Sequence, residues 1–532
     1  MPSPPASPSL ARSAGLIGAA TMSSRVLGLV REQVMAYLFG AGNAVDAFNV
    51  AFRIPNLVRD LFAEGAMSAA FVPTFTRYLR REGRPAAWRL GSHVINALLV
   101  ATLVLMAAGM LAAEPLVRVL AGDYAAVPGK FELTVDLTRV MLPFLTLVAV
   151  AAACMGMLNA LDRYLVPALA PALFNVASIV TTLAAIPALV WAGVPTIHAM
   201  ALGVLAGGVA QVAVQLPALH REGYRHKPVL DPAEPGLRQV LLLMGPGTLG
   251  LAATQVNVFV NTWLATGEGT GAVSWLGYAF RLMYLPLGVF GVAIATASLP
   301  AISRRAADGD LAGMRQTVSS GLAMMLSLTL PATIGLIVLA HPVVALLFER
   351  GQFAPSDTAA TAGAVMAYAI GLAGYSVVKI ASPTFYALGD SRTPVAVSAL
   401  SVLVNAALNI LLVRELGYRG LALGTSVTAL LNAGVLVWLL RGRLGGLDLG
   451  HLASVCARVL LASLVMGAAA WGLDRQAHVW LPGTALPVQL LRVGIAIGGS
   501  LAVLALLLTL LRVTEFTDVT RSVARRLRGR RP

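Results

Sequence analysis

Charge is scarce in this sequence. Asp, Glu, Lys and Arg make up only 12% of its 532 residues, whereas 58% of the residues are hydrophobic. Soluble domains carry roughly 25% charged residues, and a chain with half of that proportion has too little polar surface to cover an apolar interior. The composition therefore excludes a soluble globular protein and predicts a polytopic membrane protein.

Motifs that carry covalent chemistry are also missing. The two cysteines, Cys154 and Cys456, stand alone in or beside apolar segments, which excludes a disulfide framework and a cysteine-based metal site. The Walker A, H-E-x-x-H and G-x-S-x-G patterns do not occur. We therefore predict that the protein is not an enzyme and has no catalytic residues, no metal site and no cofactor.

The net charge of +15 is spread over the ends of apolar segments. Neither a basic domain nor interleaved aromatic residues are present to grip a nucleic acid, so we expect no nucleic-acid partner. If the N-terminus is cytoplasmic, most Lys and Arg residues fall on the cytoplasmic side, as the positive-inside rule requires. The charge pattern thus predicts a multi-pass topology with both termini in the cytoplasm.

Apolar segments long enough to cross a bilayer recur about fourteen times, and one of them is expected to run from 46 to 78. Part of the pattern repeats at an offset of 228 residues, because Ala51-Phe52-Arg53 recurs as Ala279-Phe280-Arg281. Six helices separate the copies, and an even number keeps both copies in the same orientation.

The predicted fold is therefore all-α, with about fourteen transmembrane helices arranged as two parallel-repeat lobes of six helices plus two C-terminal helices. The predicted divisions are a disordered N-terminal tail (1–11), an N-lobe (12–225), a C-lobe (226–440), the two extra helices (441–511) and a basic cytoplasmic tail (512–532).

Arginines inside apolar sequence are the main functional signal. Arg25, Arg31, Arg53 and Arg59 lie in the first two predicted helices, and Arg281 is the repeat-mate of Arg53. A charged side chain at the centre of a bilayer costs roughly 2.5–3.5 kcal/mol, so several of them are expected to face a polar cavity. A cationic cavity suits an anionic ligand such as a phosphate or pyrophosphate.

Polar residues accompany these arginines. On one helix, Asp46, Asn49, Arg53, Asn56, Asp60 and Glu64 would fall within a single arc of roughly 80°. Besides lining a cavity, the arginines could snorkel to the interface or form internal ion pairs, and both alternatives stay open. The candidate pairs are Arg31 with Glu32 or Asp46, and Arg59 with Asp60 or Glu64.

Several motifs resemble those of the MurJ (MviN) family of lipid II flippases, and the resemblance covers nearly the whole chain. They are Ser23-Ser24-Arg25-Val26-Leu27-Gly28, Asp46-Ala47-Phe48, Ile54-Pro55-Asn56-Leu57, Leu61-Phe62-Ala63-Glu64-Gly65-Ala66, Val273-Ser274-Trp275, Arg281-Leu282-Met283 and Tyr386-Ala387-Leu388-Gly389-Asp390-Ser391-Arg392-Thr393-Pro394.

The resemblance implies the fold of the multidrug/oligosaccharidyl-lipid/polysaccharide exporter superfamily, with the two extra helices forming a groove for a lipid tail. It also implies that lipid II, an undecaprenyl-diphosphate-linked peptidoglycan precursor, is flipped from the inner to the outer leaflet of the bacterial inner membrane. Membrane lipids and cell-wall synthesis proteins are the other expected partners. The implied substrate-binding residues are Ser24, Arg25, Arg31, Asp46, Asn56, Arg59 and Arg281, supported by Gly28, Arg53, Pro55 and Glu64.

Two features depart from the family pattern. Tyr284 stands where some relatives carry an acidic residue. The candidate ion site offers Asn257, Asn405, Asn409 and Thr425 instead of carboxylates, so coupling to a monovalent cation or to the membrane potential stays undecided. The alternatives are a flippase for another undecaprenyl-diphosphate-linked glycan and a drug/cation antiporter, although an antiporter would need intramembrane carboxylates.

Overall fold

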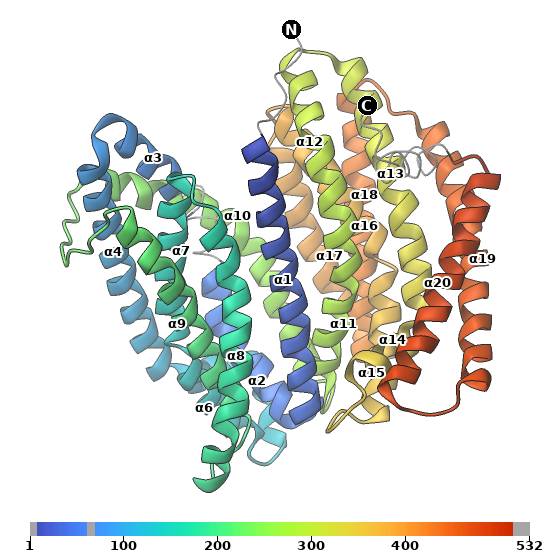
Figure 1. Ribbon diagram of the computed structural model, residues 1–532, viewed down its shortest axis with the longest axis horizontal. Helices are drawn as coiled ribbons and strands as arrows, with labels where there is room; N and C mark the ends of the chain where they lie inside the picture. Colours follow the sequence, from blue (N-terminus) through green and yellow to red (C-terminus); the bar gives the residue numbers. More distant parts are fainter. Residues whose placement is uncertain (1–7, 61–66, 68–69, 514–532) are drawn as a thin grey trace. The chain divides into compact units, whose positions relative to one another are not determined.

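The computed structural model describes the backbone of residues 8–60, 67 and 70–513 (Figure 1), and the side chains of these residues except 8–17, 58 and 245–254. These ranges contain helices and no β-strand. The chain divides into two compact units, Met1–Ser274 (unit 1) and Trp275–Pro532 (unit 2). The division lies inside a helix, α11 (Ala272–Pro286), whereas the sequence repeat predicts a lobe boundary between residues 225 and 226.

Unit 1 contains ten α-helices and one short 3-10 helix in the described part of the chain. They are α1 (Pro8–Phe39), α2 (Asn43–Arg59), α3 (Val72–Arg81), α4 (Gly83–Leu111), α5 (Ala113–Ala121), η2 (Gly122–Ala126), α6 (Lys130–Met141), α7 (Phe144–Ala160), α8 (Leu165–Trp191), α9 (His198–Arg221) and α10 (Pro235–Thr266).

Unit 2 takes most of α11 and continues with one π-helical turn and nine α-helices in its described residues. They are η3 (Leu287–Gly291), α12 (Val292–Ala307), α13 (Leu311–Val338), α14 (Ala340–Phe348), α15 (Pro355–Ala369), α16 (Leu372–Ala387), α17 (Arg392–Leu416), α18 (Tyr418–Arg443), α19 (Leu449–Trp480) and α20 (Leu486–Leu510). α19 and α20 run side by side (Figure 1) and pack on α13 and α14.

Acidic residues start two of the long helices in unit 2. The carboxylate of Asp310 accepts a hydrogen bond from Gly313 N at 2.8 Å, and that of Asp448 accepts one from His451 N at 3.0 Å. The first N–H groups of a helix have no partner within the helix, so such a cap contributes about 1 kcal/mol. These caps fix the residues at which α13 and α19 begin.

Among the described residues, ten helices or joined helices are long and apolar enough to cross a membrane. The pair α15 and α16, bent by 41°, makes an eleventh if it is one span. The prediction of a multi-pass helical protein is confirmed, whereas the count of fourteen spans stays a prediction.

One local expectation differs from the structure, and another lies partly outside the described residues. α1 begins at Pro8, inside the segment 1–11 that the sequence predicts to be a disordered tail. Of the helix predicted at 46–78, α2 ends at Arg59 and α3 begins at Val72; the described residues between them, 60, 67, 70 and 71, are π-helical, and 61–66, 68 and 69 lie outside the described residues.

The two units share an order of packing. α8 packs on α9, α7 on α9 and α4 on α7 in unit 1, as α17 packs on α18, α16 on α18 and α13 on α16 in unit 2. Each partner in unit 2 follows its counterpart in the same sequence order. This correspondence supports the duplication that the sequence repeat indicates.

Glycine pairs bring two of these helix pairs into close contact. A Cβ atom added to Gly203 on α9 would lie 2.7 Å from a carbonyl oxygen of α8, and one added to Gly420 on α18 would lie 2.2 Å from a carbonyl oxygen of α17. Gly207 and Gly424, four residues further on, are equally confined. Both helices thus carry the Gly-x-x-x-Gly spacing that lets membrane helices approach backbone to backbone.

Candidate substrate-binding residues

α1 presents one exposed arginine beside its contact with α8. The carbonyl oxygen of Ser24 accepts a hydrogen bond from Asn175 Nδ2 of α8 at 3.2 Å, and Ser24 itself is half-buried. Arg25 is exposed. One turn later, a Cβ at Gly28 would lie 3.6 Å from the same Asn175 amide, an ordinary contact distance. α1 is therefore held through its backbone, and Arg25 is left accessible.

Arg31 is held more tightly. Its Nη2 atom lies 3.0 Å from Glu32 Oε1, and its guanidinium carbon lies 5.4 Å from the centre of the Phe174 ring on α8. The side chain of Arg31 is 18% exposed and that of Glu32 is 5% exposed. Of the two candidate carboxylate partners for Arg31, the structure therefore chooses Glu32.

Asp60 collects three side chains at the end of α2. Its Oδ1 atom accepts hydrogen bonds from Arg59 Nε at 3.0 Å and Nη2 at 2.8 Å. Its Oδ2 atom accepts from Asn56 Nδ2 at 3.4 Å and from Gln255 Nε2 of α10 at 3.3 Å. This carboxylate fixes the direction of the Arg59 guanidinium, whose side chain stays 34% exposed. The two bonds to Asp60 use Nε and Nη2 of Arg59 and do not involve its Nη1 group.

Asp46 is fully buried and surrounded by donors. Its carboxylate accepts hydrogen bonds from Lys130 Nζ at 2.9 Å, Gly271 N at 2.7 Å, Ser274 N at 3.1 Å and Ser274 Oγ at 2.7 Å. Lys130 is 3% exposed, and its Nζ atom lies 3.9 Å from the centre of the Tyr124 ring. A carboxylate removed from water needs such donors. The structure thus places Asp46 in a closed ion pair, not open to a substrate as the family resemblance implies.

The remaining predicted residues are spread over both units. Arg53 is half-buried and Pro55 is buried, both on α2, whereas Glu64 lies outside the described residues. Arg281 is exposed on α11 in unit 2. Arg281 belongs to unit 2 and the other residues to unit 1, and a cavity that they share stays a prediction.

Tyr284 lies one turn from Arg281. It is 41% exposed, and its ring centre lies 4.7 Å from that of Phe280 and 6.2 Å from that of Tyr375. The position that is acidic in some relatives therefore carries an uncharged aromatic surface here. Arg281 accordingly has no carboxylate at that position of its own helix.

The candidate ion site separates into two groups. Asn257 is on α10, where its Oδ1 atom accepts from Asn261 Nδ2 at 3.0 Å. On α17, Asn409 Nδ2 donates to Asn405 Oδ1 at 3.0 Å, and Asn405 Nδ2 lies 3.4 Å from Thr425 Oγ1 of α18. The hydrogen bond from Asn405 to Thr425 joins α17 to α18, and a cation site among these residues stays a prediction. No group of three or more His, Cys, Asp or Glu side chains able to hold a metal occurs in the described part of the chain.

Sequence reasoning missed the partners that organise these sites. Lys130 lies just before an apolar run and 84 positions from Asp46, and Gln255 lies 195 positions from Asp60. Neither residue has a motif around it. Lys130 is a single lysine at the first residue of α6, and Gln255 is a neutral side chain inside α10, so neither stands out in the sequence.

The apolar helices, their paired order of packing and the arginines set among them define the class of this protein as a polytopic membrane protein with a transporter fold. A solved structure titled as the inward-facing conformation of a multidrug resistance MATE family transporter of the MOP superfamily has a similar fold. It has a TM-score of 0.65 at 17% identity, over 81% of this chain and 98% of that one.

The chain belongs to the lipid II flippase MurJ family, whose model matches residues 35–491. It is 35% identical over 489 residues to the probable lipid II flippase MurJ of Vibrio cholerae serotype O1, covering 89% of this chain and 90% of the relative. It is 37% identical over 427 residues to the lipid II flippase MurJ of Burkholderia cenocepacia, covering 80% and 82%. A solved structure of lipid II flippase MurJ in an inward closed conformation has a TM-score of 0.76 at 23% identity, covering 93% and 99%.

Proposed function

We propose that this chain transports lipid II, an undecaprenyl-diphosphate-linked peptidoglycan precursor, from the inner to the outer leaflet of the bacterial cytoplasmic membrane. The observation that carries the proposal is family membership over nearly the whole chain, since the relatives from Vibrio and Burkholderia are lipid II flippases by name. Transport moves the substrate without making or breaking a bond, so the protein acts as a transporter and not as an enzyme.

The diphosphate of the substrate is the group that the arginines would bind. A guanidinium offers a planar fork of donors that matches phosphate oxygens in pairs, which an ammonium group does not. The pairs Arg31–Glu32 and Arg59–Asp60 orient two such forks, and Arg25 adds an exposed one. Arg281 would supply a cation from unit 2, and Ser24 and Asn56 would add neutral polar groups.

Alternating access is the mechanism that we infer for this transport. The bound diphosphate offsets repulsion between the arginines, so the substrate favours whichever state holds them closer together, and a ligand shifts an equilibrium only through such differential affinity. The membrane potential or a monovalent cation is the proposed source of energy. A potential of 100 mV is worth about 2.3 kcal/mol for each charge that moves across the membrane.

The prenyl tail needs an apolar path, and we assign it to the segment 441–511. α19 and α20 belong to this segment and expose large apolar side chains, among them Leu461, Leu464, Leu490 and Leu501. A long prenyl chain gains nothing from a cationic chamber, whereas it can lie along such a surface at little cost. α19 and α20 are therefore expected to guide the tail while the head group crosses.

Complementation tests the function directly. The chain should restore growth to a bacterium depleted of its own lipid II flippase, whereas a flippase for another glycan would not restore it. Arg59→Lys and Arg281→Lys should each impair rescue at normal protein level, since lysine keeps the charge and loses the fork. Arg118→Lys, at a 68% exposed arginine on α5, is the matched control and should rescue fully. Full rescue by both test variants would rule out the paired recognition of phosphate.

A reporter fused to the C-terminus tests the topology. Both termini are proposed to lie in the cytoplasm of an inner-membrane protein. A green fluorescent protein fused after residue 532 should therefore fluoresce, because it folds on the cytoplasmic side. A fused alkaline phosphatase, which needs the periplasm, should stay inactive. The reverse pattern would invert the proposed orientation.

A further inference from the structure

The segment 222–234, between α9 and α10, folds back along the first half of α4; we call it the strap. Three α4 residues on one face hold its middle. Ser92 Oγ accepts from Lys227 N at 3.3 Å, Asn96 Nδ2 donates to Lys227 O at 2.7 Å and to Val229 O at 2.8 Å, and His93 Nδ1 accepts from Asp231 N at 3.1 Å. The strap is therefore fixed at Lys227 through its backbone.

The beginning of the strap is anchored as well. Tyr224 is fully buried, its ring centre lies 5.4 Å from that of Trp88 on α4, and burial raises the pKa of its hydroxyl to about 12. The Glu222 carboxylate accepts from Arg163 Nε at 2.7 Å and lies 3.4 Å from Arg84 Nη2. These contacts make the strap an ordered part of unit 1, so its side chains have defined positions.

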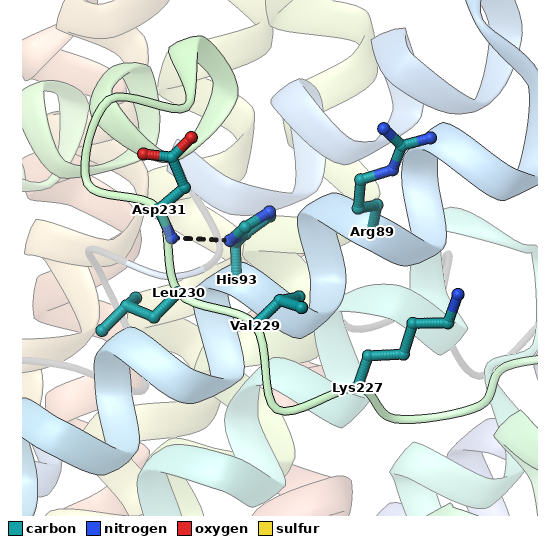
Figure 2. A pocket seen from close by; sticks show the side chains of 6 residues that line it. All are labelled: Arg89, His93, Lys227, Val229, Leu230 and Asp231. Carbon is teal, nitrogen blue, oxygen red and sulfur yellow. Dashed lines mark hydrogen bonds between the residues drawn. The ribbon is translucent and has the colours of Figure 1, made fainter.

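A pocket of about 440 Å³ opens between the strap and α4, lined by Arg89, His93, Lys227, Val229, Leu230 and Asp231 (Figure 2). In this view Arg89 and Lys227 lie on one side of the His93 ring and Asp231 on the other. The Asp231 carboxylate is engaged by Ala233 N at 2.9 Å. Neither Arg89 nor Lys227 forms an ion pair with any described residue, so the pocket has two cations outside any ion pair and one carboxylate, that of Asp231.

The position of the pocket along α4 indicates its surroundings. Apolar side chains of α4 become exposed from Val100 onward, seven residues after His93, or about 10 Å along the helix. On the strap, Val229 and Leu230 are 37% and 44% exposed beside Lys227. Arg89 lies a further turn back, about 16 Å along α4 from Val100. The pocket thus combines cations with exposed apolar groups near an apolar stretch of helix, as a site for a lipid head group does.

We propose that Arg89, His93 and Lys227 form a binding site for the phosphate group of an anionic phospholipid. Arg89 supplies its guanidinium fork and Lys227 a point charge, while the buried His93 adds a polar ring beside them. Val229 and Leu230 contact the start of the acyl chains. The strap holds Lys227 in place before the lipid arrives, so little ordering is needed on binding.

The test measures lipid binding to the purified full chain by native mass spectrometry, with phosphatidylglycerol and phosphatidylcholine as probes. Arg89→Gln/Lys227→Gln should weaken phosphatidylglycerol binding by about 30-fold, since one basic group near a membrane surface is worth about fivefold. The matched control is Arg81→Gln/Arg238→Gln, which removes two exposed arginines from α3 and α10 outside the pocket and should change binding less than threefold. Thermal melting checks that both variants are folded.

Asn96→Leu tests whether lipid binding depends on the position of the strap or only on the amount of positive charge. This change removes the strap's hydrogen bonds at Lys227 and Val229 while every charge stays. It should weaken phosphatidylglycerol binding several-fold, with no effect on phosphatidylcholine. Equal loss in the pocket and control double variants, or unchanged binding in Asn96→Leu, would overturn the proposal. Inorganic phosphate that displaces phosphatidylglycerol completely would assign the pocket to a soluble anion and would also overturn it.

Discussion

Replacing Lys130 by methionine tests the buried ion pair most directly. Methionine keeps much of the length of the side chain and leaves the Asp46 carboxylate, which is 0% exposed, without its only cationic partner in the described structure. Breaking a buried pair in this way typically costs 3–5 kcal/mol. Asp46 retains three donors, from Gly271 and Ser274, so we expect a loss near the lower limit, about 3 kcal/mol in the free energy of unfolding.

Replacing Asp46 completes a double-mutant cycle, which measures the interaction energy between Asp46 and Lys130. Asp46→Asn keeps the shape but leaves Lys130 buried against the Tyr124 ring with no carboxylate. The double variant Asp46→Asn/Lys130→Met contains neither charge and should be destabilised by about 2 kcal/mol less than the sum of the single variants. Unfolding in mixed micelles, titrated with a denaturing detergent, gives the free energy of unfolding of the wild type, the two single variants and the double variant.

An exposed pair serves as the control. Arg118 and Glu114 lie 2.6 Å apart with side chains 68% and 54% exposed, so Arg118→Met should cost about 0.5 kcal/mol or less. If Lys130→Met costs as little as this control, or if the effects at positions 46 and 130 simply add, the buried pair does not hold the fold together. If Lys130→Met kept wild-type stability but lost transport, Asp46 would instead be assigned to substrate binding.

Three further outcomes are expected. Gly424→Ala should destabilise the protein by about 1–3 kcal/mol, since its Cβ would lie 2.0 Å from a buried amide oxygen, whereas Gly434→Ala on the same helix meets nothing within 4 Å and should be neutral or stabilising in the same denaturation assay. Hydrogen bonds from the backbone and hydroxyl of Thr393 hold the pKa of Asp390 below its usual range, so its contribution to stability is complete above the ordinary carboxyl pKa and is lost as the pH falls through the lowered value. The stability difference between wild type and Asp390→Asn should accordingly shrink on acidification, and a constant difference would reject this assignment. Deleting the chain after Arg443 should abolish complementation while the remaining helices still insert, and full rescue by that truncation would remove the tail role of α19 and α20.

Contacts between residues that are close in sequence could be predicted, whereas contacts between distant residues could not. The pairs Arg31–Glu32 and Arg59–Asp60 join neighbours in the chain, so both are among the partners that the sequence predicts. The contact of Asp46 with Ser274 joins residues 228 positions apart, and it depends on how α2, α6 and the start of α11 pack. No local pattern encodes that packing.

The fold shows the same limit. Low charge and long apolar runs are sufficient to predict membrane helices, because the bilayer imposes that length and that composition. The π-helical residues 60, 70 and 71 between α2 and α3 were not predicted, and neither was the hydrogen bond from Asn409 to Asn405. Both depend on where polar backbone and amide groups find partners in three dimensions, which apolar periodicity does not report.

The glycine contacts of α9 and α18 also bear on how the protein is made. α17 and α18 are joined by a single residue, Gly417, whose φ of 58° suits glycine, and α8 is joined to α9 by a short connection, 192–197. Each pair can therefore close as a hairpin as soon as its second helix enters the bilayer, before the later helices are synthesised. Each pair then buries its own interface without waiting for a distant partner, which shortens the time in which a growing chain presents unpaired helices to the translocation machinery.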